Sequence, residues 1–445
     1  MKKTLFLCCL WILTSLVSAQ TKLNEYILEG LKSNEMLNQR KISLERSLWA
    51  LKEAKNLYSP SITFGANYYR ADGGRTVDFP IGDLLNPVYQ TLNQLTGSDR
   101  FPQLENQSIL LNPNDFYDAR FRVSMPLINA EIQHNKRIKQ YQYDLQKTEI
   151  SIYQRELIKD VKKAYFQYLQ ATKAIEIYEN AQKIVAESNR VNKSLFNNQK
   201  VNRTVVTRSE NELTKIESQI KVAQENQKNA QAYFNFLLNK PLESPIQIEE
   251  YNNLPTLKDT DTEISKREEL SKLATATQVN NEVTALSKAY LVPKVNIFAD
   301  LGSQGFQWKF NDKTRYYFAG ISLEWNLFAS GRNLQKIKQN ELDGKVLVSQ
   351  INHTNSQLQL QAQTSINTFK SSVALYESNM AQQKTAIQYY NDMLKLYKEG
   401  QALYIELLDA QNQYISTQLQ TNIALFDTWM KYAEVERANA SFNIE

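Results

Sequence analysis

Apolar and neutral side chains recur in alternating steps of four and three residues in two long segments. The first series lies between residues 157 and 185, and the second between residues 366 and 397. The first consists of Leu157, Val161, Ala164, Tyr168, Ala171, Ile175, Tyr178, Gln182 and Val185. The second consists of Ile366, Phe369, Val373, Tyr376, Met380, Gln383, Ile387, Tyr390, Leu394 and Tyr397. Such heptad-like seams predict helices that pack side by side, as in coiled coils.

Proline and glycine, the residues that most often end helices, are missing from the same parts of the chain. Residues 127–240 contain neither, and after Gly331 only Gly344 and Gly400 occur. Both stretches are therefore predicted to be almost wholly helical. A helix over residues 131–197 would be roughly 100 Å long. No compact globular domain needs such a length, whereas a structural spacer or a tunnel does.

Four short segments alternate between apolar and polar residues. They cover residues 61–70, 119–126, 294–302 and 317–325. Their apolar positions are Ile62, Phe64, Ala66 and Tyr68; Phe121, Val123 and Met125; Val295, Ile297, Ala299 and Leu301; and Tyr317, Ala319, Ile321, Leu323 and Trp325. A period of two predicts strands with one apolar and one wet face. The strands pair as two hairpins, one with a long loop at 71–118 and one with a short loop at 303–315.

Two interpretations of these strands are open: amphipathic hairpins on a soluble domain, or strands that cross a membrane. The chain offers no other sheet or globular core for the apolar faces to cover, which favours the membrane. The predicted mature chain contains no apolar run of about 18 residues, so a transmembrane helix is not expected. Four strands do not close a barrel, and open edges in lipid leave backbone groups unpaired. A homotrimer would supply twelve strands to one shared barrel.

The chain also resembles itself. Residues 121–128 match residues 321–328 at an offset of 200, and residues 57–60 match residues 290–293 at an offset of 233. The difference of 33 residues lies in an insert between Arg70 and Asp118, which its prolines and glycines mark as a surface loop. We interpret the chain as an internal duplication with a long insert in the first copy.

The predicted organisation has three parts. Residues 1–19 have the charged start, short apolar run and small-residue cleavage site of a secretory signal peptide. The first structural repeat covers residues 20–245 and the second residues 246–445. Each contains a helix, a β-hairpin and a long helical hairpin.

Cleavage of the signal peptide would change the available chemistry. It removes Cys8 and Cys9, so that cysteine nucleophiles, disulfides and cysteine metal sites are not expected. A lipoprotein site at either cysteine is disfavoured because both lie inside the apolar run. Loss of Lys2 and Lys3 lowers the formal net charge from +5 to +3. That value is too near neutral to indicate a nucleic-acid partner.

Several segments, in this order, resemble the TolC-like outer-membrane efflux family over essentially the whole mature chain. They are residues 23–31 leading to 58–60, the strand-to-helix joints at 125–128 and 325–332, the joint at 238–242, and residues 397–411. The last is the most specific, because Tyr-Lys-Glu-Gly-Gln-Ala-Leu-Tyr-Ile-Glu-Leu-Leu-Asp-Ala-Gln is similar to the family's turn at the periplasmic tip of a helical hairpin.

The resemblance implies a mainly α-helical protein with a membrane β part. Three chains would form a periplasmic tunnel of helices and share a twelve-stranded barrel in the outer membrane of a Gram-negative bacterium, in contact with its lipid. The implied function is a passive exit duct of a tripartite efflux or type I secretion system. Its partners would be a periplasmic adaptor protein and an inner-membrane transporter that delivers the substrates.

The resemblance also implies a gate at the periplasmic mouth. Glu406 and Asp409 fall where the family has acidic residues that line the mouth, and two carboxylate rings there would favour cations. Tyr397 falls on a tyrosine that helps to hold the mouth shut. Arg203 and Arg208 are hypothetical partners of these carboxylates across neighbouring hairpins. In the alternative interpretation, Glu406 and Asp409 are two solvated acidic residues near a turn.

The expected hairpin-tip turns, where the adaptor would bind, contain Gln199 and Lys200 in the first repeat and Gly400 and Gln401 in the second.

Two other classes of function are weighed against the duct. A periplasmic coiled-coil scaffold or adaptor without a pore would not need strands with Tyr and Trp at their ends. An enzyme has little support. His134 and His353 are the only histidines, and neither has metal-ligand spacing. The sequence shows no glycine-rich phosphate loop and no nucleophile elbow. We therefore predict no catalytic, cofactor-binding or metal-binding residues.

Overall fold

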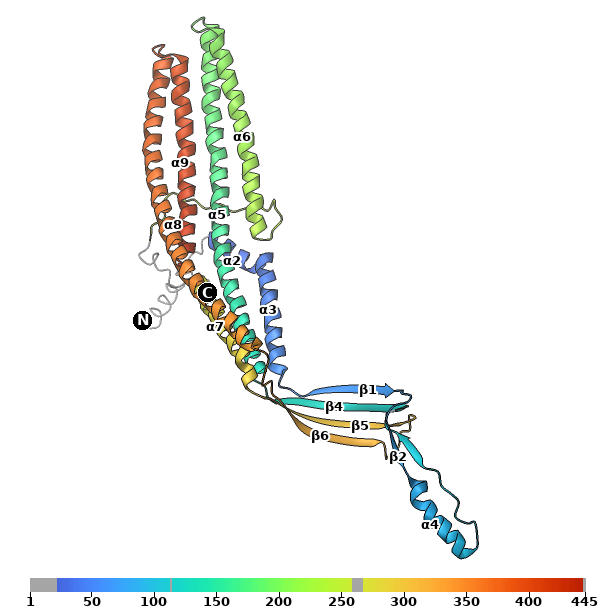
Figure 1. The fold of residues 1–445 in the computed structure, drawn as a ribbon. Coiled ribbons are helices and arrows are strands. Elements are labelled where there is room, and N and C mark those ends of the chain that lie inside the picture. Colours follow the sequence, from blue (N-terminus) through green and yellow to red (C-terminus); the bar gives the residue numbers. More distant parts are fainter. Residues whose placement is uncertain (1–21, 113, 258–266, 443–445) are drawn as a thin grey trace, which may run out of the picture. The chain divides into compact units, whose positions relative to one another are not determined.

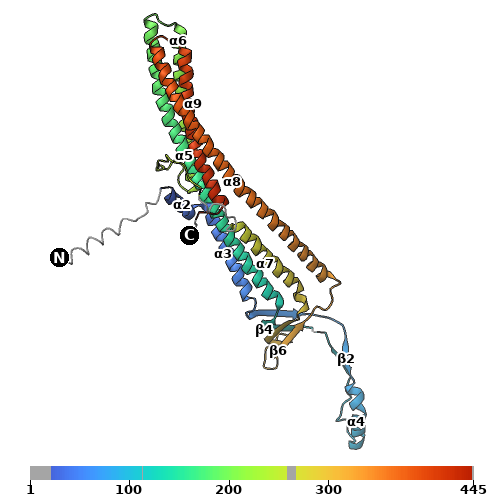
Figure 2. The ribbon, with the colours of Figure 1, turned by 90° about the vertical axis from the view of Figure 1, so that its left-hand side faces the viewer.

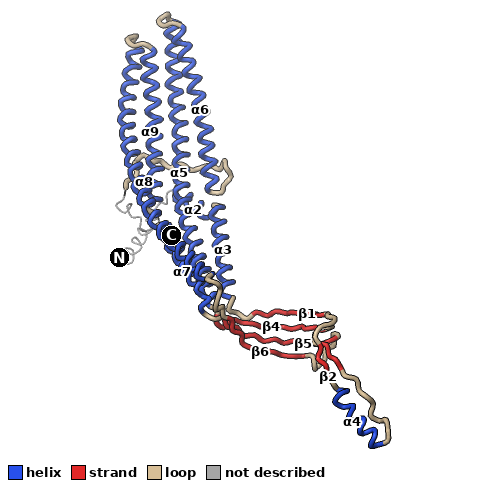
Figure 3. Tube along the Cα trace, in the orientation of Figure 1, coloured by secondary structure: helices blue, strands red, loops and turns tan. Residues whose placement is uncertain are grey.

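The structure is a computed structural model that describes residues 22–112, 114–257 and 267–442. The predicted signal peptide at residues 1–19 lies outside the described residues. The chain divides into two compact units. The helical unit contains the described residues up to Trp49 together with 140–280 and 342–442, and the sheet unit contains residues 50–139 and 281–341. Helices dominate, with one small group of strands (Figure 1; Figure 3).

Two long helical hairpins form most of the helical unit. Helix α5 (Ala130–Asn197) is followed by α6 (Arg203–Leu237), and α8 (Arg332–Lys398) is followed by α9 (Tyr404–Ala438). The two helices of each hairpin run side by side in both ribbon views (Figure 1; Figure 2). The prediction of a helix over residues 131–197 is confirmed, with a start one residue earlier. These are the stretches that lack helix-ending residues.

The predicted seams are buried to different degrees. On α5, Val161, Ala164 and Val185 are fully buried, as the heptad pattern predicts. On α8 the buried stripe includes Ser365, Ser372 and Asn379, whereas Met380 and Ile387 of the predicted seam are exposed. The seam of α8 is therefore only partly covered within one chain.

The largest core lies where the short N-terminal helices meet the long ones. Helix α2 (Lys22–Ser33) and the start of α3 (Glu35–Asn56) pack on α5, on the end of α6 and on Phe426 of α9. At its centre, aromatic rings pack against one another with centroids 5 to 6.5 Å apart. They are Tyr165, Phe166, Phe234, Tyr251 and Trp429.

An ionic network holds residue 267 and the start of α7 (Glu268–Lys288) against the end of α9. Arg267, which is 3% exposed, donates to both carboxylate oxygens of Glu269 at 2.9 Å and to the carbonyl of Ala438 at 2.6 Å. Arg437 donates to Glu269 at 2.7 Å and to Glu156 at 3.1 Å. Burial opposes ionisation of Glu269, but these hydrogen bonds outweigh it and lower the Glu269 pKa to about 2.

The sheet unit contains one four-stranded antiparallel sheet with the order β1-β4-β5-β6. The strands are β1 (Ser61–Tyr69), β4 (Phe116–Ile128), β5 (Lys294–Phe306) and β6 (Arg315–Glu324). The four predicted strands and both predicted hairpins are confirmed. Strands β4 and β5 extend further than the alternating pattern indicates, so the loop between β5 and β6 is shorter than the predicted 303–315.

The insert at 71–118 is more ordered than the predicted surface loop. It contains strands β2 (Thr76–Phe79) and β3 (Gln107–Leu110), which pair antiparallel, and helix α4 (Ile81–Thr96) between them. The sequence did not predict this helix, because its prolines and glycines indicated a loop. Pro80 lies at the start of the helix, Pro87 lies inside it, and Gly97 ends it with φ 63°.

The two halves of the chain contain elements of the same kind in the same order. A helix, two paired strands and a long helical hairpin occur as α3, β1, β4, α5 and α6, and again as α7, β5, β6, α8 and α9. The hairpins also agree in length, with 68 and 67 residues in α5 and α8 and 35 in both α6 and α9.

Across the part of the chain that the structure describes, no helix combines the length and the apolar character needed to cross a membrane.

Candidate functional site

The two hairpin tips have the same backbone geometry. In the first, the N–H of Lys200 donates to the carbonyl of Leu195 at 2.9 Å. In the second, the N–H of Gln401 donates to the carbonyl of Leu396 at 2.9 Å. Each helix thus ends in a turn of the Schellman type, which requires a left-handed residue. Gly400 occupies that position with φ 75° in the second tip, and Gln199 with φ 59° in the first.

A tyrosine just before the second turn joins the two hairpins. Tyr397 of α8 is buried, and its hydroxyl donates to Oδ1 of Asn192 on α5 at 2.5 Å. The ring of Tyr404, at the start of α9, lies 5.9 Å from that of Tyr397. Burial raises the pKa of Tyr397 and raises that of Tyr404 to about 12, so both hydroxyls are protonated at neutral pH.

Further buried polar contacts lie close to this link. The hydroxyl of Ser209 on α6 donates to Asn189 on α5 at 2.9 Å. The hydroxyl of Ser188 on α5 lies 3.5 Å from Oε1 of Gln411 on α9, at the limit of a hydrogen bond. These polar contacts lie beside a buried apolar cluster that includes Leu407 and Leu408 of α9, so polar and apolar contacts together hold the tips.

The predicted acidic pair lies directly after this cluster. Glu406 and Asp409 are both exposed on the first turns of α9, three residues apart and thus on one face. The Glu406 carboxylate also accepts the N–H of Leu403 at 2.8 Å, which makes it a cap of the helix. Sequence reasoning missed this second role, although a Glu three residues after the N-cap position is its usual signal.

The predicted arginine partners are not paired with these carboxylates inside one chain. Arg203 and Arg208 are exposed on the first turns of α6, and the structure records no ion pair between either and Glu406 or Asp409 among the described residues. The charge of Arg208 lowers the pKa of Tyr404 against the larger effect of burial, which places the guanidinium near that ring. Pairing between neighbouring chains stays a prediction.

One face of the sheet is apolar and open. The cross-strand partners Ile62 and Val123, Phe64 and Phe121, and Leu301 and Tyr317 all lie on it, because paired residues share a face. Phe64 is 62% exposed, Leu301 63% and Tyr317 81%. In water this contiguous apolar surface would be unfavourable by about 25 cal/mol per Å². The apolar sets predicted from sequence share this face within the strands, whereas Trp325 lies just beyond the end of β6.

The other face carries paired charges. Arg122 donates to both carboxylate oxygens of Asp300 at 2.7 Å, and Asp300 is 3% exposed. Arg120 donates to Asp118 at 2.7 Å. Phe298 also lies here, with Arg122 above its ring, and was not predicted on this face. Its ring fills the space above Gly320, where an added Cβ would meet it at 3.0 Å.

Aromatic side chains gather at both ends of the strands. At the end next to the insert, the indole of Trp308 stacks on Tyr68 and Tyr117 with centroids 5.2 and 5.3 Å away. At the opposite end, Tyr58 donates to the carbonyl of Asn129 at 2.8 Å, and Trp325 is exposed. Membrane strands place such residues at the two lipid interfaces.

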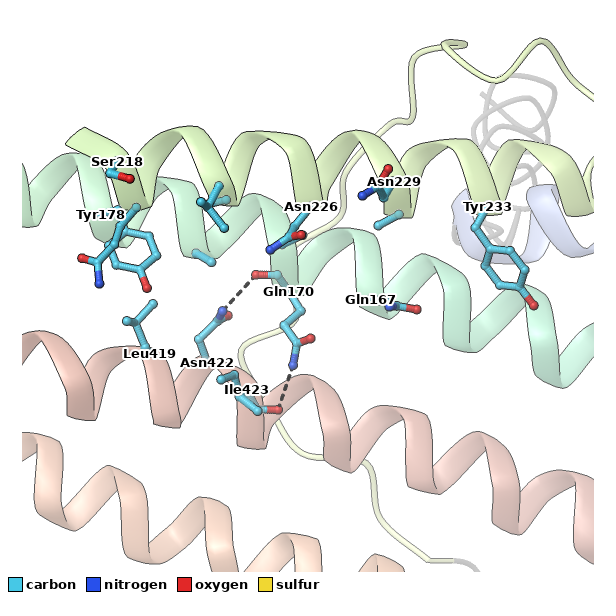
Figure 4. Close-up of a pocket in the computed structure, with 16 residues that line it drawn as sticks. Gln167, Gln170, Tyr178, Ser218, Asn226, Asn229, Tyr233, Leu419, Asn422 and Ile423 are labelled. Atoms are coloured by element: carbon cyan, nitrogen blue, oxygen red, sulfur yellow. Dashed lines mark hydrogen bonds between the residues drawn. The ribbon is translucent and has the colours of Figure 1, made fainter. Parts of the chain in front are cut away.

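A groove of about 700 Å³ lies between α5, α6 and α9 (Figure 4). Its walls are mostly amides, alanines and tyrosines rather than ionisable groups. Asn422 donates to the carbonyl of Gln170 at 2.9 Å, and Gln170 donates to that of Ile423 at 3.3 Å, so these amides hold α9 against α5 (Figure 4). The groove is a seam between helices, and its lining residues include no carboxylate, imidazole or cationic side chain.

The described residues contain no cluster of three metal-ligating side chains. His134, one of the two histidines, forms a hydrogen bond of 2.7 Å with Glu282.

No protein-family model and no curated protein sequence matches the chain. Solved structures do match. The outer membrane protein VceC from Vibrio cholerae has a TM-score of 0.75 at 14% identity, over 94% of this chain and 95% of that one. The CmeC outer membrane channel from Campylobacter jejuni has 0.74 at 14% identity, over 94% and 85%.

The open state of the MtrE outer membrane channel from Neisseria gonorrhoeae gives a TM-score of 0.73 at 15% identity, over 94% of this chain and 88% of that one. The described chain therefore has the fold of these outer-membrane channels, with long helical hairpins and a small β part.

Proposed function

We propose that this chain is the outer-membrane exit duct of a tripartite efflux or type I secretion system. Three copies form one helical tunnel in the periplasm and one twelve-stranded barrel in the outer membrane. The duct itself is passive, and an inner-membrane pump supplies substrate and energy. The observation that carries the proposal is the sheet with one open apolar face and one charged face.

That sheet argues for lipid on one side and water on the other. Its apolar face holds Phe64, Leu301, Ile321 and similar residues with no element of the sheet unit to cover them. Its charged face pairs Arg122 with Asp300, which suits a water-filled bore. Strands of this length also fit a membrane, because about nine to eleven tilted residues span it.

The sheet edges argue for several copies. Strands β1 and β6 are the outer strands of the order β1-β4-β5-β6, and each has one edge without a partner in the sheet. An open edge in lipid costs several kcal/mol per unpaired backbone group. Pairing β1 of one chain with β6 of the next removes these edges, and three copies close a twelve-stranded barrel. Exposed Leu360, Met380 and Ile387 on α8 are then available to neighbouring chains.

The tips are assigned to the periplasmic mouth. Glu406 and Asp409 of three chains form two carboxylate rings that favour cations, and Arg203 and Arg208 pair with them across chains when the mouth is closed. Tyr397 holds the second hairpin to the first. The turns with Gln199, Lys200, Gly400 and Gln401 present backbone and amide groups to a periplasmic adaptor.

The test is electrical conductance of the detergent-extracted protein in a planar lipid bilayer, with its mass measured by light scattering. We expect a mass of three chains, recovery from the membrane fraction, and uniform current steps that prefer cations. Recovery in the periplasmic extract without insertion into the bilayer would favour the alternative, a coiled-coil scaffold or adaptor that has no pore. The residues of the apolar sheet face speak against that alternative.

A further inference from the structure

Helix α4, in the insert between β1 and β4, has three distinct faces. One is held down by the segment that returns to β3. Asn86 donates to the carbonyl of Leu104 at 2.9 Å and accepts its N–H at 2.8 Å. Asn93, seven residues later, makes the same pair of bonds with Phe101 at 2.8 and 3.1 Å. The insert is thus a braced structure that fixes the rotation of α4.

A second face of α4 is apolar and largely uncovered, with Ile81 and Leu92 half-buried. Ile81, Leu85, Val88, Leu92 and Leu95 follow one another in steps of four, three, four and three residues. Val88 is 52% and Leu95 80% exposed. This spacing is the heptad seam of a coiled coil, whose a and d positions pack against a partner helix. The third face, with Asp83, Gln90 and Gln94, is polar and lies on the far side.

The residue types of the seam select the number of helices. Leu85 and Leu92 occupy the a positions, and Ile81, Val88 and Leu95 the d positions. Leucine at a with β-branched residues at d shifts parallel coiled coils away from dimers and toward three or four helices, and Ile81 and Val88 fit this rule at two of the three d positions. The helix carries only one charged residue, Asp83, and it lies off the seam, so identical copies meet without like-charge repulsion.

The position of α4 supplies the second argument. The insert leaves the sheet at the end of β1, which is an edge strand. In the proposed trimer β1 borders the next chain, so the insert lies beside an interface between copies. A seam of little more than two heptads is too short to associate alone. Three tethered copies raise the effective concentration enough for it to do so.

We propose that the α4 helices of three copies pack along this seam as a parallel three-helix cap at the barrel end opposite the long helices. The occupant of the apolar face is a second copy of this chain. The inference rests on the proposed trimer, and it adds a contact that the barrel and tunnel do not require.

Cysteine cross-linking of the full chain in detergent tests it. Val88→Cys puts a thiol on the seam, and Gln90→Cys puts one on the far face of the same helix as a matched control. The parent protein with its signal peptide removed controls for background. A short bismaleimide should join Val88→Cys chains into dimers, with at most two of three chains linked, and leave Gln90→Cys mostly unlinked. The mass of each sample is measured before cross-linking.

The outcomes separate the two proposals. A sample with the mass of three chains in which Val88→Cys links no better than Gln90→Cys overturns the cap and leaves the trimer intact. That result would also mean that lipid or another protein covers the seam. A sample with the mass of one chain overturns the trimer and the cap together. Preferential linking at Val88, repeated at Leu95→Cys, supports the cap.

Discussion

The hydroxyl of Tyr397 and the side chain of Asn192 join two helical hairpins whose residues lie 205 positions apart in the chain. The bond of 2.5 Å is buried. The same buried amide also acts on Tyr404 of α9, because a hydrogen bond with Asn192 lowers the Tyr404 pKa against the larger effect of burial. One buried amide on α5 therefore contacts tyrosines on both helices of the second hairpin, which suits a latch.

If this link is a latch, Tyr397→Phe should open the mouth. The substitution removes one hydrogen bond and leaves Asn192 buried with less compensation, at a cost of about 1–3 kcal/mol to the closed tip. We expect larger or more frequent current steps in a planar bilayer. Asn192→Ala should do the same, and the double variant should add little to either, because one bond is lost in all three.

Tyr390→Phe is the matched control for that experiment. Tyr390 lies one heptad earlier on α8, where its ring stacks on Tyr414 with centroids 5.5 Å apart. Removing its hydroxyl should leave the current steps unchanged. Equal steps from the parent and from Tyr397→Phe would contradict the latch.

Substitutions of Glu406 and Asp409 can separate the effect of their charge from the effect of helix capping by Glu406. Glu406→Gln combined with Asp409→Asn removes both charges but keeps an oxygen that accepts the N–H of Leu403. We expect lower cation preference in bilayer recordings and nearly unchanged thermal stability. Glu406→Ala removes the cap as well and should cost about 0.5–1 kcal/mol in addition.

Glu225→Gln controls for a general change of charge, because Glu225 is exposed on α6 and pairs only with Lys228 among the described residues. If ion selectivity is unchanged after both charges are removed, Glu406 and Asp409 do not line the mouth.

The two tip turns predict opposite effects of reciprocal substitutions. Gln199 has a left-handed backbone with φ 59°, where a side chain is unfavourable, so Gln199→Gly should stabilise the protein by up to about 1 kcal/mol. Gly400 has φ 75°, so Gly400→Gln should destabilise it by a similar amount. Thermal unfolding in detergent measures both. The same sign for both variants would mean that contacts between chains, rather than backbone conformation, decide these positions.

The ionic network predicts a dependence on pH. The pKa of Glu269 is lowered from 4.5 to about 2 in the folded chain. A lowered carboxyl pKa stabilises the fold above the unfolded value, and this stabilisation is lost as the pH falls from about 4.5 to about 2. This stabilisation is fully present at neutral pH.

Glu269→Gln should remove this stabilisation at pH 7 and flatten the acid dependence of thermal unfolding between those pH values. Glu225→Gln, which is exposed, should change neither. A parent protein whose stability is constant from pH 5 to pH 2 would mean that Arg267 and Arg437 do not hold Glu269 as described.

The elements that could be predicted from the sequence are those with a local periodic pattern. The heptad steps of residues 157–185 and the alternation of residues 61–70 are set by neighbours within a few positions, and both elements are found. The register of the sheet faces follows in the same way, except at Phe298, where Gly320 makes room for a ring on the charged face. The sequence around Phe298 or around Gly320 does not indicate that these two residues will be in contact.

Long-range contacts could not be predicted in this way. Asn192 carries no local sign that it will meet Tyr397, and Arg267 none that it will meet the end of α9. Helix α4 is a different case, because the steps from Ile81 to Leu95 are visible in the sequence. Pro80, Pro87 and Gly97 concealed them.

The two faces of the sheet give the most direct prediction about the membrane. Ile321, 72% exposed, lies on the apolar face in register with Ile297, and Ser322 beside it lies on the opposite face in register with Asn296. An arginine facing lipid near the middle of a membrane strand costs about 2–4 kcal/mol, whereas one facing a water-filled bore costs little. Ile321→Arg should therefore reduce the amount of protein in the outer-membrane fraction, and Ser322→Arg should not. The two variants differ by one position and carry the same added charge, so general effects of charge or size cancel in the comparison. If both accumulate in the membrane equally, the apolar face does not contact lipid, and the case for a shared barrel loses its main support.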